Sequence, residues 1–430
     1  MLATRRALLG NAALFGLGAA LPLPAFARPL PASRFPNVTA FVDGYVSSRK
    51  VPGMLATLGF GRDEPTVIAR GIEGFADKDP QSLDTLYRIY SMTKPVTGMA
   101  AMILIDEGKL GLDQPLGEIL PKFARMQVQV TPDGSLREVR PAKTPITIRH
   151  LLTHTAGLGY SIVQKGPIKA AYEAAGLVPG QVSKVQIPGL SRGAPVGSLA
   201  LFADRLAELP LVYEPGTRWS YSVALDLMGR VIEVASGKPF DAFLKDRLLD
   251  PLGMTSTGFQ VAKKDLHRLT TNYGIVGGTP LPIDPAEASI FADKPPFPMG
   301  GAGLVSSPRD YDRFLEMIAN YGVLDGRRVM SERAIRLGTS NLLPPGASTK
   351  GTFASGAGFG AGGRVGLGEQ VGTYGWGGAA GTVGSVDIKR GLRATMMTQY
   401  MPSNVYPLTE EFTKAVLADL AAMAGKAAPE

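Results

Sequence analysis

The sequence predicts an α/β fold in which one sheet is built from both ends of the chain, with a helix-rich region inserted between them. Near the start, a helix pattern at 37–49 precedes strand-like segments at 54–60 and 66–71. Near the end, strand-like runs at about 382–388 and 393–400 precede a helix pattern at about 408–424. Terminal helices that each adjoin strands suggest a single sheet to which both termini contribute.

The first 27 residues are typical of a secretory signal peptide. Arg5-Arg6 precede an apolar run over 7–21, and Ala25-Phe26-Ala27 provides the small residues of a cleavage site. The paired arginines indicate the twin-arginine route, which carries folded proteins. An uncleaved membrane anchor is the alternative, which the short apolar run disfavours. We therefore expect a mature domain of residues 28–430 that is bacterial, periplasmic or secreted, and free of the membrane after cleavage.

Composition excludes several classes of function. The chain has no cysteine, so thiol catalysis, disulfides and cysteine-bound metals are excluded. Only three histidines are present, which makes a histidine-rich metal site implausible, and we expect neither metal nor cofactor. The formal net charge of +8 is spread without a basic run, so we expect no nucleic-acid partner. Oligomeric state is left open.

The middle of the chain, about 146–295, is dominated by helical patterns and proline-rich loops. We therefore divide the domain into an α/β part, about 35–145 and 296–425, and an α-rich part between them. No repeat of fixed period is present. The clearest helix patterns of the α-rich part are at 147–153, 198–208, 223–236 and 240–248.

The segment with the strongest chemical signal is Tyr87–Pro95, which passes from an aromatic-rich stretch into a helix pattern. Residues three apart on a helix are neighbours, so Lys94 can reach the Ser91 hydroxyl. A serine needs a base to take its proton, and lysine can act as that base when burial lowers its pKa. At the start of a helix, the Ser91 backbone N–H is also free to bind a developing oxyanion.

S-x-x-K alone is a weak pattern, because Ser47-Ser48-Arg49-Lys50 repeats it in this chain. That copy ends a helix pattern just before Pro52-Gly53 and has no following helix to present its serine. We interpret it as a solvated surface segment.

Two further segments supply the remaining parts of a serine-hydrolase site. Tyr221, in Trp219–Val223, precedes a helix pattern and can share or relay the proton of the serine. The segment Tyr374–Ala379 lies just before an apolar strand pattern, where its glycines allow a substrate to approach closely. A backbone N–H there can complete the oxyanion site. Each segment alone has a plain structural explanation, and the combination is what points to catalysis.

Ser91-Met92-Thr93-Lys94, Tyr221-Ser222-Val223 and Trp376-Gly377-Gly378, in this order, resemble the three motifs of class C β-lactamases, DD-peptidases and especially the family VIII carboxylesterases. These enzymes belong to the penicillin-binding-protein-like superfamily. The resemblance covers about residues 35–425. Further similar stretches are Ile146–Leu158, Pro251–Thr257 and Gly300–Leu304.

The resemblance implies an antiparallel sheet flanked by terminal helices, an α-rich subdomain, and an active site in the groove between them. It implies that Ser91 is acylated and that Lys94 and Tyr221 act together as the base. It also assigns the oxyanion site to the backbone N–H groups of Ser91 and Ala379. The substrate-binding residues that it suggests are Trp376, Gly377, Gly378 and Tyr160, the last because the family often has an aromatic residue near that position.

Two positions depart from the lactamase and peptidase pattern. Trp376-Gly377-Gly378 stands where Lys-Thr-Gly is usual, so the cation and hydroxyl that bind a substrate carboxylate are missing. Val223 stands where their tyrosine motif ends in asparagine. Both changes favour neutral esters over anionic peptides and β-lactams, as in family VIII esterases.

Three other patterns are set aside. Gly189-Leu190-Ser191-Arg192-Gly193 spells G-x-S-x-G, but flanking prolines place it in a loop instead of a strand–helix turn. The run 358–363 spells G-x-G-x-x-G, but no helix follows it, so we expect it to shape the sheet near the site. His150 and His154 have i, i+4 spacing, but no third ligand cluster accompanies them, and we expect structural hydrogen bonds.

We therefore predict a serine esterase that hydrolyses short-chain carboxylic esters through an acyl-enzyme on Ser91, with acyl transfer to an alcohol as a further outcome. Its partner is a small-molecule ester. The first alternative is a β-lactamase or a D-amino-acid-specific peptidase. The second is a non-catalytic penicillin-binding-like protein that recognises cell-wall peptides.

Overall fold

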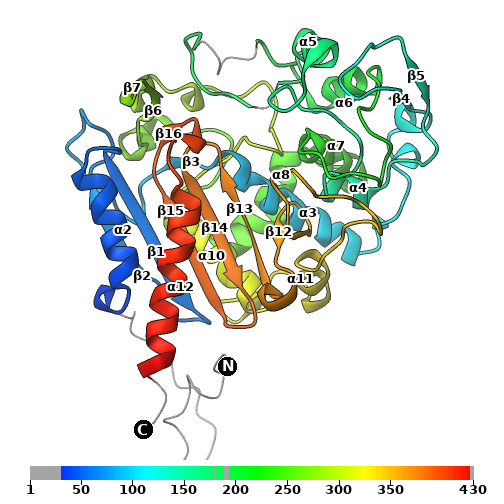
Figure 1. Ribbon diagram of the computed structural model, residues 1–430. Helices are drawn as coiled ribbons and strands as arrows, with labels where there is room; N and C mark the ends of the chain where they lie inside the picture. The colour runs from blue at the N-terminus through cyan, green and yellow to red at the C-terminus, as the bar shows by residue number, and fades with distance from the viewer. Residues whose placement is uncertain (1–30, 179, 188–192, 427–430) are drawn as a thin grey trace, which may run out of the picture.

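The structure is a computed structural model that describes residues 31–178, 180–187 and 193–426. Its largest sheet has seven strands in the order β11-β12-β13-β14-β15-β1-β2, and all neighbouring pairs are antiparallel (Figure 1). This confirms an antiparallel sheet built from both ends of the chain. The strands are β1 (Gly53–Phe60), β2 (Thr66–Gly71), β11 (Gly358–Phe359), β12 (Arg364–Val365), β13 (Thr373–Gly378), β14 (Thr382–Asp387) and β15 (Leu392–Met397).

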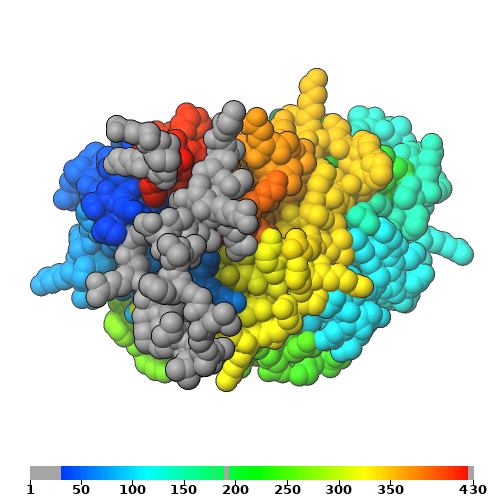
Figure 2. Space-filling model, turned by 90° about the horizontal axis from the view of Figure 1, so that it is seen from below, coloured from blue at the N-terminus to red at the C-terminus, as the bar shows by residue number. Residues whose placement is uncertain are grey.

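The terminal helices α2 (Pro36–Ser47) and α12 (Leu408–Lys426) lie side by side on one face of this sheet (Figure 1). The view from below shows the same neighbourhood of N-terminal and C-terminal segments (Figure 2). Apolar residues at helical spacing explain the packing, since Val38, Val42 and Tyr45 of α2 are buried against the sheet. Helix α10 (Pro308–Ala319) covers the opposite face.

Asp419 of α12 joins the two terminal helices. Its carboxylate accepts hydrogen bonds from the backbone N–H groups of Asn37 and Val38, each at 3.0 Å. These N–H groups belong to the first turn of α2, where no intrahelical acceptor exists. Helix α2 therefore receives its N-terminal cap from a residue near the end of the chain.

Helix α3 (Thr93–Asp106) connects the sheet to the α-rich part. Nearly every residue of α3 is buried, as expected for a helix that is apolar on all sides. It packs against α7 (Ala224–Ser236), α11 (Glu332–Gly338) and β13. The other helices are α4 (Ile148–Leu152), α5 (Gly166–Ala174), α6 (Leu199–Ala207), α8 (Phe240–Leu244) and α9 (Asp250–Leu252). The helix expected over 240–248 is thus shorter, because a wider π-type turn follows at Lys245–Leu249.

The region 146–295 also contains a β-hairpin that the helix-dominated prediction did not include. Strands β6 (Asn272–Val276) and β7 (Thr279–Asp284) are joined by Gly277-Gly278, both with positive φ. Two consecutive left-handed residues are what a tight hairpin turn requires, and glycine adopts this conformation without strain. Strand β6 then pairs with β16 (Tyr400–Met401). The remaining short strands are β3 (Tyr87–Arg88), β4 (Gln127–Gln129), β5 (Val139–Pro141), β8 (Val305–Ser306), β9 (Val323–Leu324) and β10 (Arg327–Arg328).

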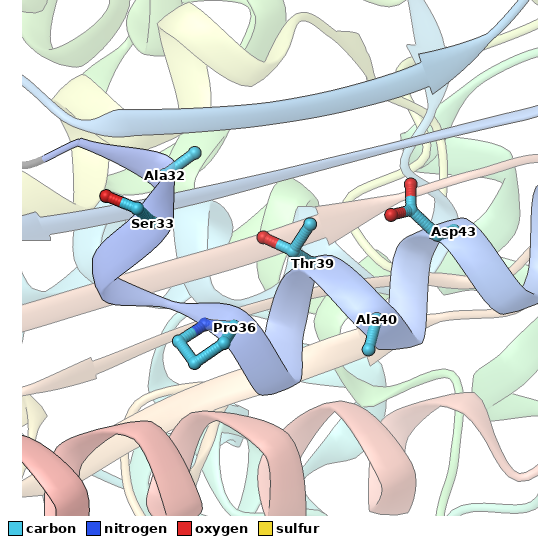
Figure 3. A pocket seen from close by; sticks show the side chains of 6 residues that line it. All are labelled: Ala32, Ser33, Pro36, Thr39, Ala40 and Asp43. Atoms are coloured by element: carbon cyan, nitrogen blue, oxygen red, sulfur yellow. The ribbon is translucent and has the colours of Figure 1, made fainter.

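Within the described part of the chain, no helix combines the length and the apolar character that crossing a bilayer requires. The predicted signal peptide, residues 1–27, lies outside the described residues. A surface pocket of about 450 Å³ lies along the start of α2 (Figure 3). It contains none of the predicted site residues. Its lining residues are Ala32, Ser33, Pro36, Thr39, Ala40 and Asp43.

Candidate active site

Ser91, Lys94 and Tyr221 form one hydrogen-bonded cluster. The Ser91 Oγ atom lies 3.1 Å from Lys94 Nζ and 2.7 Å from Tyr221 Oη. Lys94 is fully buried, and its Nζ lies 4.6 Å from the centre of the Tyr221 ring. The serine hydroxyl therefore has two potential proton acceptors within hydrogen-bonding distance.

The turn that carries Ser91 has a strained backbone. Ser91 lies in a 3₁₀ turn, Tyr90–Met92, directly before α3, and Tyr90 has a φ of 40°. Bulky residues seldom adopt this left-handed region, so packing around the turn must hold it. Because α3 follows at once, Lys94 lies one turn after Ser91, as the S-x-x-K spacing predicts.

The glycine-rich segment Gly300–Leu304 lies along α3 and provides an acceptor for Lys94. Lys94 Nζ donates to the Gly301 carbonyl oxygen at 2.7 Å, and Thr97 Oγ1 donates to that of Gly300 at 2.7 Å. A Cβ atom on Gly300 would lie 2.4 Å from the Leu225 carbonyl oxygen, so this close approach requires glycine. The Gly301 carbonyl thereby holds the Lys94 ammonium, and the Gly300 carbonyl holds the same segment to α3 through Thr97.

Asp226 is a buried carboxylate beside this cluster. Its Oδ1 accepts from the Gly301 N–H at 2.9 Å, whereas Oδ2 has no partner among the described residues. Burial raises the pKa of Asp226 to about 6, although the nearby Lys94 charge acts in the opposite direction. The carboxylate therefore holds the backbone segment to which Lys94 donates.

Strand β13 brings the third motif to the site. The indole N–H of Trp376 donates to Tyr221 Oη at 3.3 Å. A Cβ on Gly378 would lie 2.4 Å from the Ile89 carbonyl oxygen, so only glycine allows the strand to pass this close to the Ser91 turn. Gly377 precedes this contact and Ala379 follows it. Trp376, predicted to bind substrate, thus also contacts the tyrosine directly.

Tyr160 packs against the cluster from the α-rich side. Its ring centre lies 5.4 Å from that of Tyr221 and 5.7 Å from Lys94 Nζ. It is only 2% exposed, so it forms the wall behind Tyr221 more than an open substrate surface. Burial, with the neighbouring Asp226 and Tyr221, raises the pKa of Tyr160 well above its ordinary value.

Phe353 marks the solvent side of the cluster. Its ring lies edge-on to that of Tyr221 at 5.9 Å between centres, and the residue is 68% exposed. Tyr221 itself is only 7% exposed. An exposed aromatic side chain therefore lies between the buried Tyr221 ring and solvent.

The patterns set aside in the sequence lie elsewhere or have structural partners. Ser48, Arg49 and Lys50 are exposed at the end of α2. Residues 358–363 form β11 and the turn into β12 at the edge of the sheet. His150 caps α4 through Thr147, and His154 bonds to Ser222, which confirms structural hydrogen bonds for both. No group of metal-binding side chains occurs among the residues described. Residues 189–192 of the G-x-S-x-G pattern lie outside them.

An antiparallel sheet and an α-rich part that meet at a half-buried serine, a buried lysine and a buried tyrosine define a serine hydrolase of the penicillin-binding-protein-like class. The chain belongs to the beta-lactamase family, whose sequence profile, described as Beta-lactamase, matches residues 38–418. It is an enzyme of the serine hydrolase type that this family comprises.

Similar proteins include an esterase, a hydrolase and a protein whose name states no activity. Esterase EstB from Burkholderia gladioli is 32% identical over 414 residues, covering 90% of this chain and 96% of EstB. Protein Rv1367c from Mycobacterium tuberculosis is 35% identical over 348 residues, covering 76% and 82% of the two chains. The solved structure of EstCE1 is described as a hydrolase with promiscuous acyltransferase activity. It matches this chain with a TM-score of 0.69 at 27% identity, and the match covers 89% of this chain and 98% of EstCE1.

Three residues of the site, Asp226, His154 and Phe353, were not predicted as site residues from the sequence. Asp226 carried a usable signal, since it is the only acidic residue among the buried positions of α7. His154 was predicted only to make structural hydrogen bonds, and the structure also places its ring against that of Tyr221. Phe353 lies in an irregular segment with no periodic pattern, so only the folded chain shows its position.

Proposed function

We propose that this protein is a serine esterase of the family VIII carboxylesterase type, which hydrolyses neutral carboxylic esters through an acyl-enzyme on Ser91. The observation that carries the proposal is the pair of hydrogen bonds that Lys94 Nζ and Tyr221 Oη donate to Ser91 Oγ. A positioned base within this distance is what activates a serine nucleophile.

Acylation begins when Ser91 Oγ attacks the ester carbonyl carbon. The hydroxyl proton passes to the Tyr221–Lys94 pair, and the carbonyl oxygen takes up the negative charge. The backbone N–H groups of Ser91 and Ala379 bind that oxyanion. When the tetrahedral intermediate collapses, the carbon–oxygen bond to the alcohol breaks and the alkoxide takes the proton from the pair. The products of this half-reaction are a free alcohol and an acyl group on Ser91.

Deacylation repeats these steps with a second nucleophile. A water molecule gives its proton to Tyr221 and attacks the acyl carbon. The bond from that carbon to Ser91 Oγ then breaks, Oγ takes the proton back from Tyr221, and the carboxylic acid leaves. An alcohol in the place of water would yield a new ester. The hydrolase and acyltransferase activities stated for EstCE1 support both outcomes.

A neutral substrate follows from the residues around Tyr221. Trp376 replaces the lysine that binds a substrate carboxylate in lactamases and peptidases, and its N–H is engaged with Tyr221 Oη. Phe353 adds an exposed apolar surface at the opening. These side chains favour an apolar acyl or alcohol group, and EstB supports an ester as substrate.

The cellular location is part of the proposal. Residues 1–27 act as a twin-arginine signal peptide, and the mature enzyme works in the periplasm or outside the cell. Expression of the full chain with Arg5 and Arg6 replaced by lysine tests this. The mature form should appear in the periplasmic fraction only when the arginines are intact, and equal export of both chains would contradict it.

The activity is tested by initial rates of p-nitrophenyl butyrate hydrolysis for the mature protein and for Ser91→Ala, with a chromogenic cephalosporin alongside. We expect ester hydrolysis that falls at least about a thousandfold in Ser91→Ala. Turnover of the cephalosporin alone would assign the protein as a lactamase or peptidase. Failure of a fluorophosphonate to label Ser91 would assign it as a non-catalytic binding protein, and full activity of Ser91→Ala would show that Ser91 is not the nucleophile.

A further inference from the structure

His154 lies directly behind Tyr221 and has no part in the mechanism above. The two ring centres are 4.9 Å apart, and His154 is only 1% exposed. Its backbone φ is 55°, in the left-handed region that residues other than glycine seldom adopt. Strained backbone of this kind persists only where the surrounding contacts hold it.

The contacts that hold His154 run to both neighbours of Tyr221. The His154 carbonyl oxygen accepts from the Ser220 N–H at 2.9 Å. The side-chain Nδ1 accepts from the Ser222 N–H at 3.3 Å and lies 2.9 Å from Ser222 Oγ. One residue therefore binds the backbone on either side of the tyrosine, and its ring packs against the phenol between them.

These bonds fix the protonation of the imidazole. Since Nδ1 accepts from a backbone N–H, the proton of the neutral ring is on Nε2, which is buried without a hydrogen-bond partner among the described residues. Burial, and then the charge of Lys94, lower the pKa of His154 well below its ordinary value. The side chain is thus a neutral acceptor, although one buried polar atom is left unsatisfied.

We propose that His154 is a positioning residue that fixes Tyr221 against Ser91, which rests on the proposed function because Tyr221 is the proton acceptor there. The left-handed backbone directs the carbonyl oxygen and Nδ1 to the same short loop. With both bonds in place, the backbone on either side of Tyr221 is held, and Tyr221 Oη lies 2.7 Å from Ser91 Oγ. Loss of the side-chain acceptor frees the Ser222 end of the loop.

Two substitutions of His154 distinguish the role of its hydrogen-bond acceptor, Nδ1, from the role of its aromatic ring. His154→Phe keeps an aromatic ring but has no acceptor at the position of Nδ1. His154→Asn loses the ring but keeps an oxygen near that position, and asparagine tolerates the left-handed backbone. With p-nitrophenyl butyrate, we expect kcat to fall roughly 10- to 100-fold in His154→Phe with KM within about twofold of the wild type. His154→Asn should keep kcat within about threefold.

His150→Phe is the matched control, since His150 is also buried, and its Nδ1 accepts from the Thr147 N–H in the cap of α4. We expect a lower melting temperature and kcat within about twofold of the wild type, because that bond does not reach Tyr221. Similar losses of kcat in the two phenylalanine variants would overturn the proposal. So would an equal loss of kcat in His154→Asn and His154→Phe.

The decisive measurement is the rate of Ser91 labelling by a fluorophosphonate in single and double variants. If His154 acts through Tyr221, His154→Phe should slow labelling in the wild-type background and change it less than about twofold in Tyr221→Phe. An equal slowing in both backgrounds would overturn the proposal. Should His154→Phe not fold, Ser222→Ala replaces it. We expect Ser222→Ala to lower the labelling rate about two- to fivefold in the wild-type background and to leave it unchanged in the Tyr221→Phe background. Failure of the proposed function would be seen separately, because Ser91→Ala would then hydrolyse the ester as fast as the wild type.

Discussion

At the scale of single residues, Tyr221 Oη has two polar neighbours of different kinds, Ser91 Oγ and the indole N–H of Trp376. The indole can only donate, so it favours a tyrosine oxygen that accepts. Trp376 thus donates a neutral hydrogen bond to the tyrosine oxygen. Trp376, which stands where lysine is usual in the motif, thus has a direct role in the proposed proton transfer.

Trp376→Phe removes that N–H and keeps most of the aromatic packing. A neutral hydrogen bond contributes about 0.5–1.5 kcal/mol, so we expect kcat for p-nitrophenyl butyrate to fall about two- to tenfold. Steady-state kinetics of the two proteins measure this. An unchanged kcat with a raised KM would show instead that Trp376 only binds substrate.

Asp226→Asn tests the buried carboxylate beside Lys94. The pKa of Asp226 is raised to about 6 in the folded protein, so the folded state binds this proton more tightly than the unfolded state. The free energy of unfolding therefore falls as pH rises from about 4 to about 6, and the charged carboxylate costs at most roughly 3 kcal/mol above that range. Asparagine cannot ionise and retains an oxygen for the Gly301 N–H.

We accordingly expect Asp226→Asn to melt several degrees above the wild type at pH 7.5, with the difference narrowing as the pH approaches 4. Thermal unfolding at a series of pH values measures this. A variant that melts below the wild type at pH 7.5 would show that the carboxylate is needed to balance the Lys94 charge.

At this scale the sequence identified the residues whose spacing is local and missed those that meet only in the fold. Ser91 and Lys94 are one helical turn apart, and Tyr221 and Trp376 each lie in a recognisable sequence motif. Asp226 and His154 join the cluster through Gly301 and Ser222, from segments far from Ser91 along the chain. No spacing rule links such positions, so their roles required the three-dimensional structure.

At the scale of elements, helix α3 approaches the edge of the sheet through Gly98. A Cβ on Gly98 would lie 2.1 Å from the Ala361 carbonyl oxygen, so a backbone atom would have to move. The run 358–363, expected to shape the sheet near the site, is thus the surface against which the Lys94 helix packs. Glycine at this helix position is required by the fold despite its cost to the helix.

Two glycine-to-alanine substitutions should therefore have opposite signs. A Cβ on Gly44 of α2 would meet no other atom within 4 Å, so Gly44→Ala should stabilise the protein by about 0.5–1 kcal/mol. Gly98→Ala should destabilise it by more than about 2 kcal/mol and lower kcat, because α3 carries Lys94. Denaturant unfolding of both variants measures this, and a stable, fully active Gly98→Ala would contradict the contact.

The β6–β7 hairpin was not predicted, although the sequence contains a local turn pattern for it. Gly277-Gly278 between two short runs is a hairpin pattern. Prolines at 280 and 282 weaken the strand pattern of β7, since proline cannot donate to a ladder. In the structure β7 is an edge strand, where prolines are tolerated.

At the scale of the whole molecule, both ends of the chain meet on one face of the sheet, away from Ser91. The terminal helices pack together, and Asp419 caps α2. The sequence predicted this arrangement because strands and amphipathic helices occur at both ends. It could not predict the cap, because Asp419 lies 382 positions after Asn37 and 381 positions after Val38 in the sequence.

Asp419→Ala should leave the first turn of α2 without its acceptor. We expect a loss of about 1–2 kcal/mol in the free energy of unfolding and an unchanged kcat, since neither terminal helix carries a site residue. Lys414→Ala, on the exposed side of α12, is the control and should stay within about 0.5 kcal/mol of the wild type. Equal stability of Asp419→Ala and the control would show that the cap contributes little.

The place of β15 between β14 and β1 also sets the timing of folding during synthesis. Thr57 pairs with Thr395, which the ribosome adds 338 residues later. At about 5–20 residues per second, β1 waits roughly 20–70 s for this partner. Over that interval the backbone edge of β1 that will meet β15 is unpaired and open to pairing with other chains. The sheet closes only when translation is nearly finished.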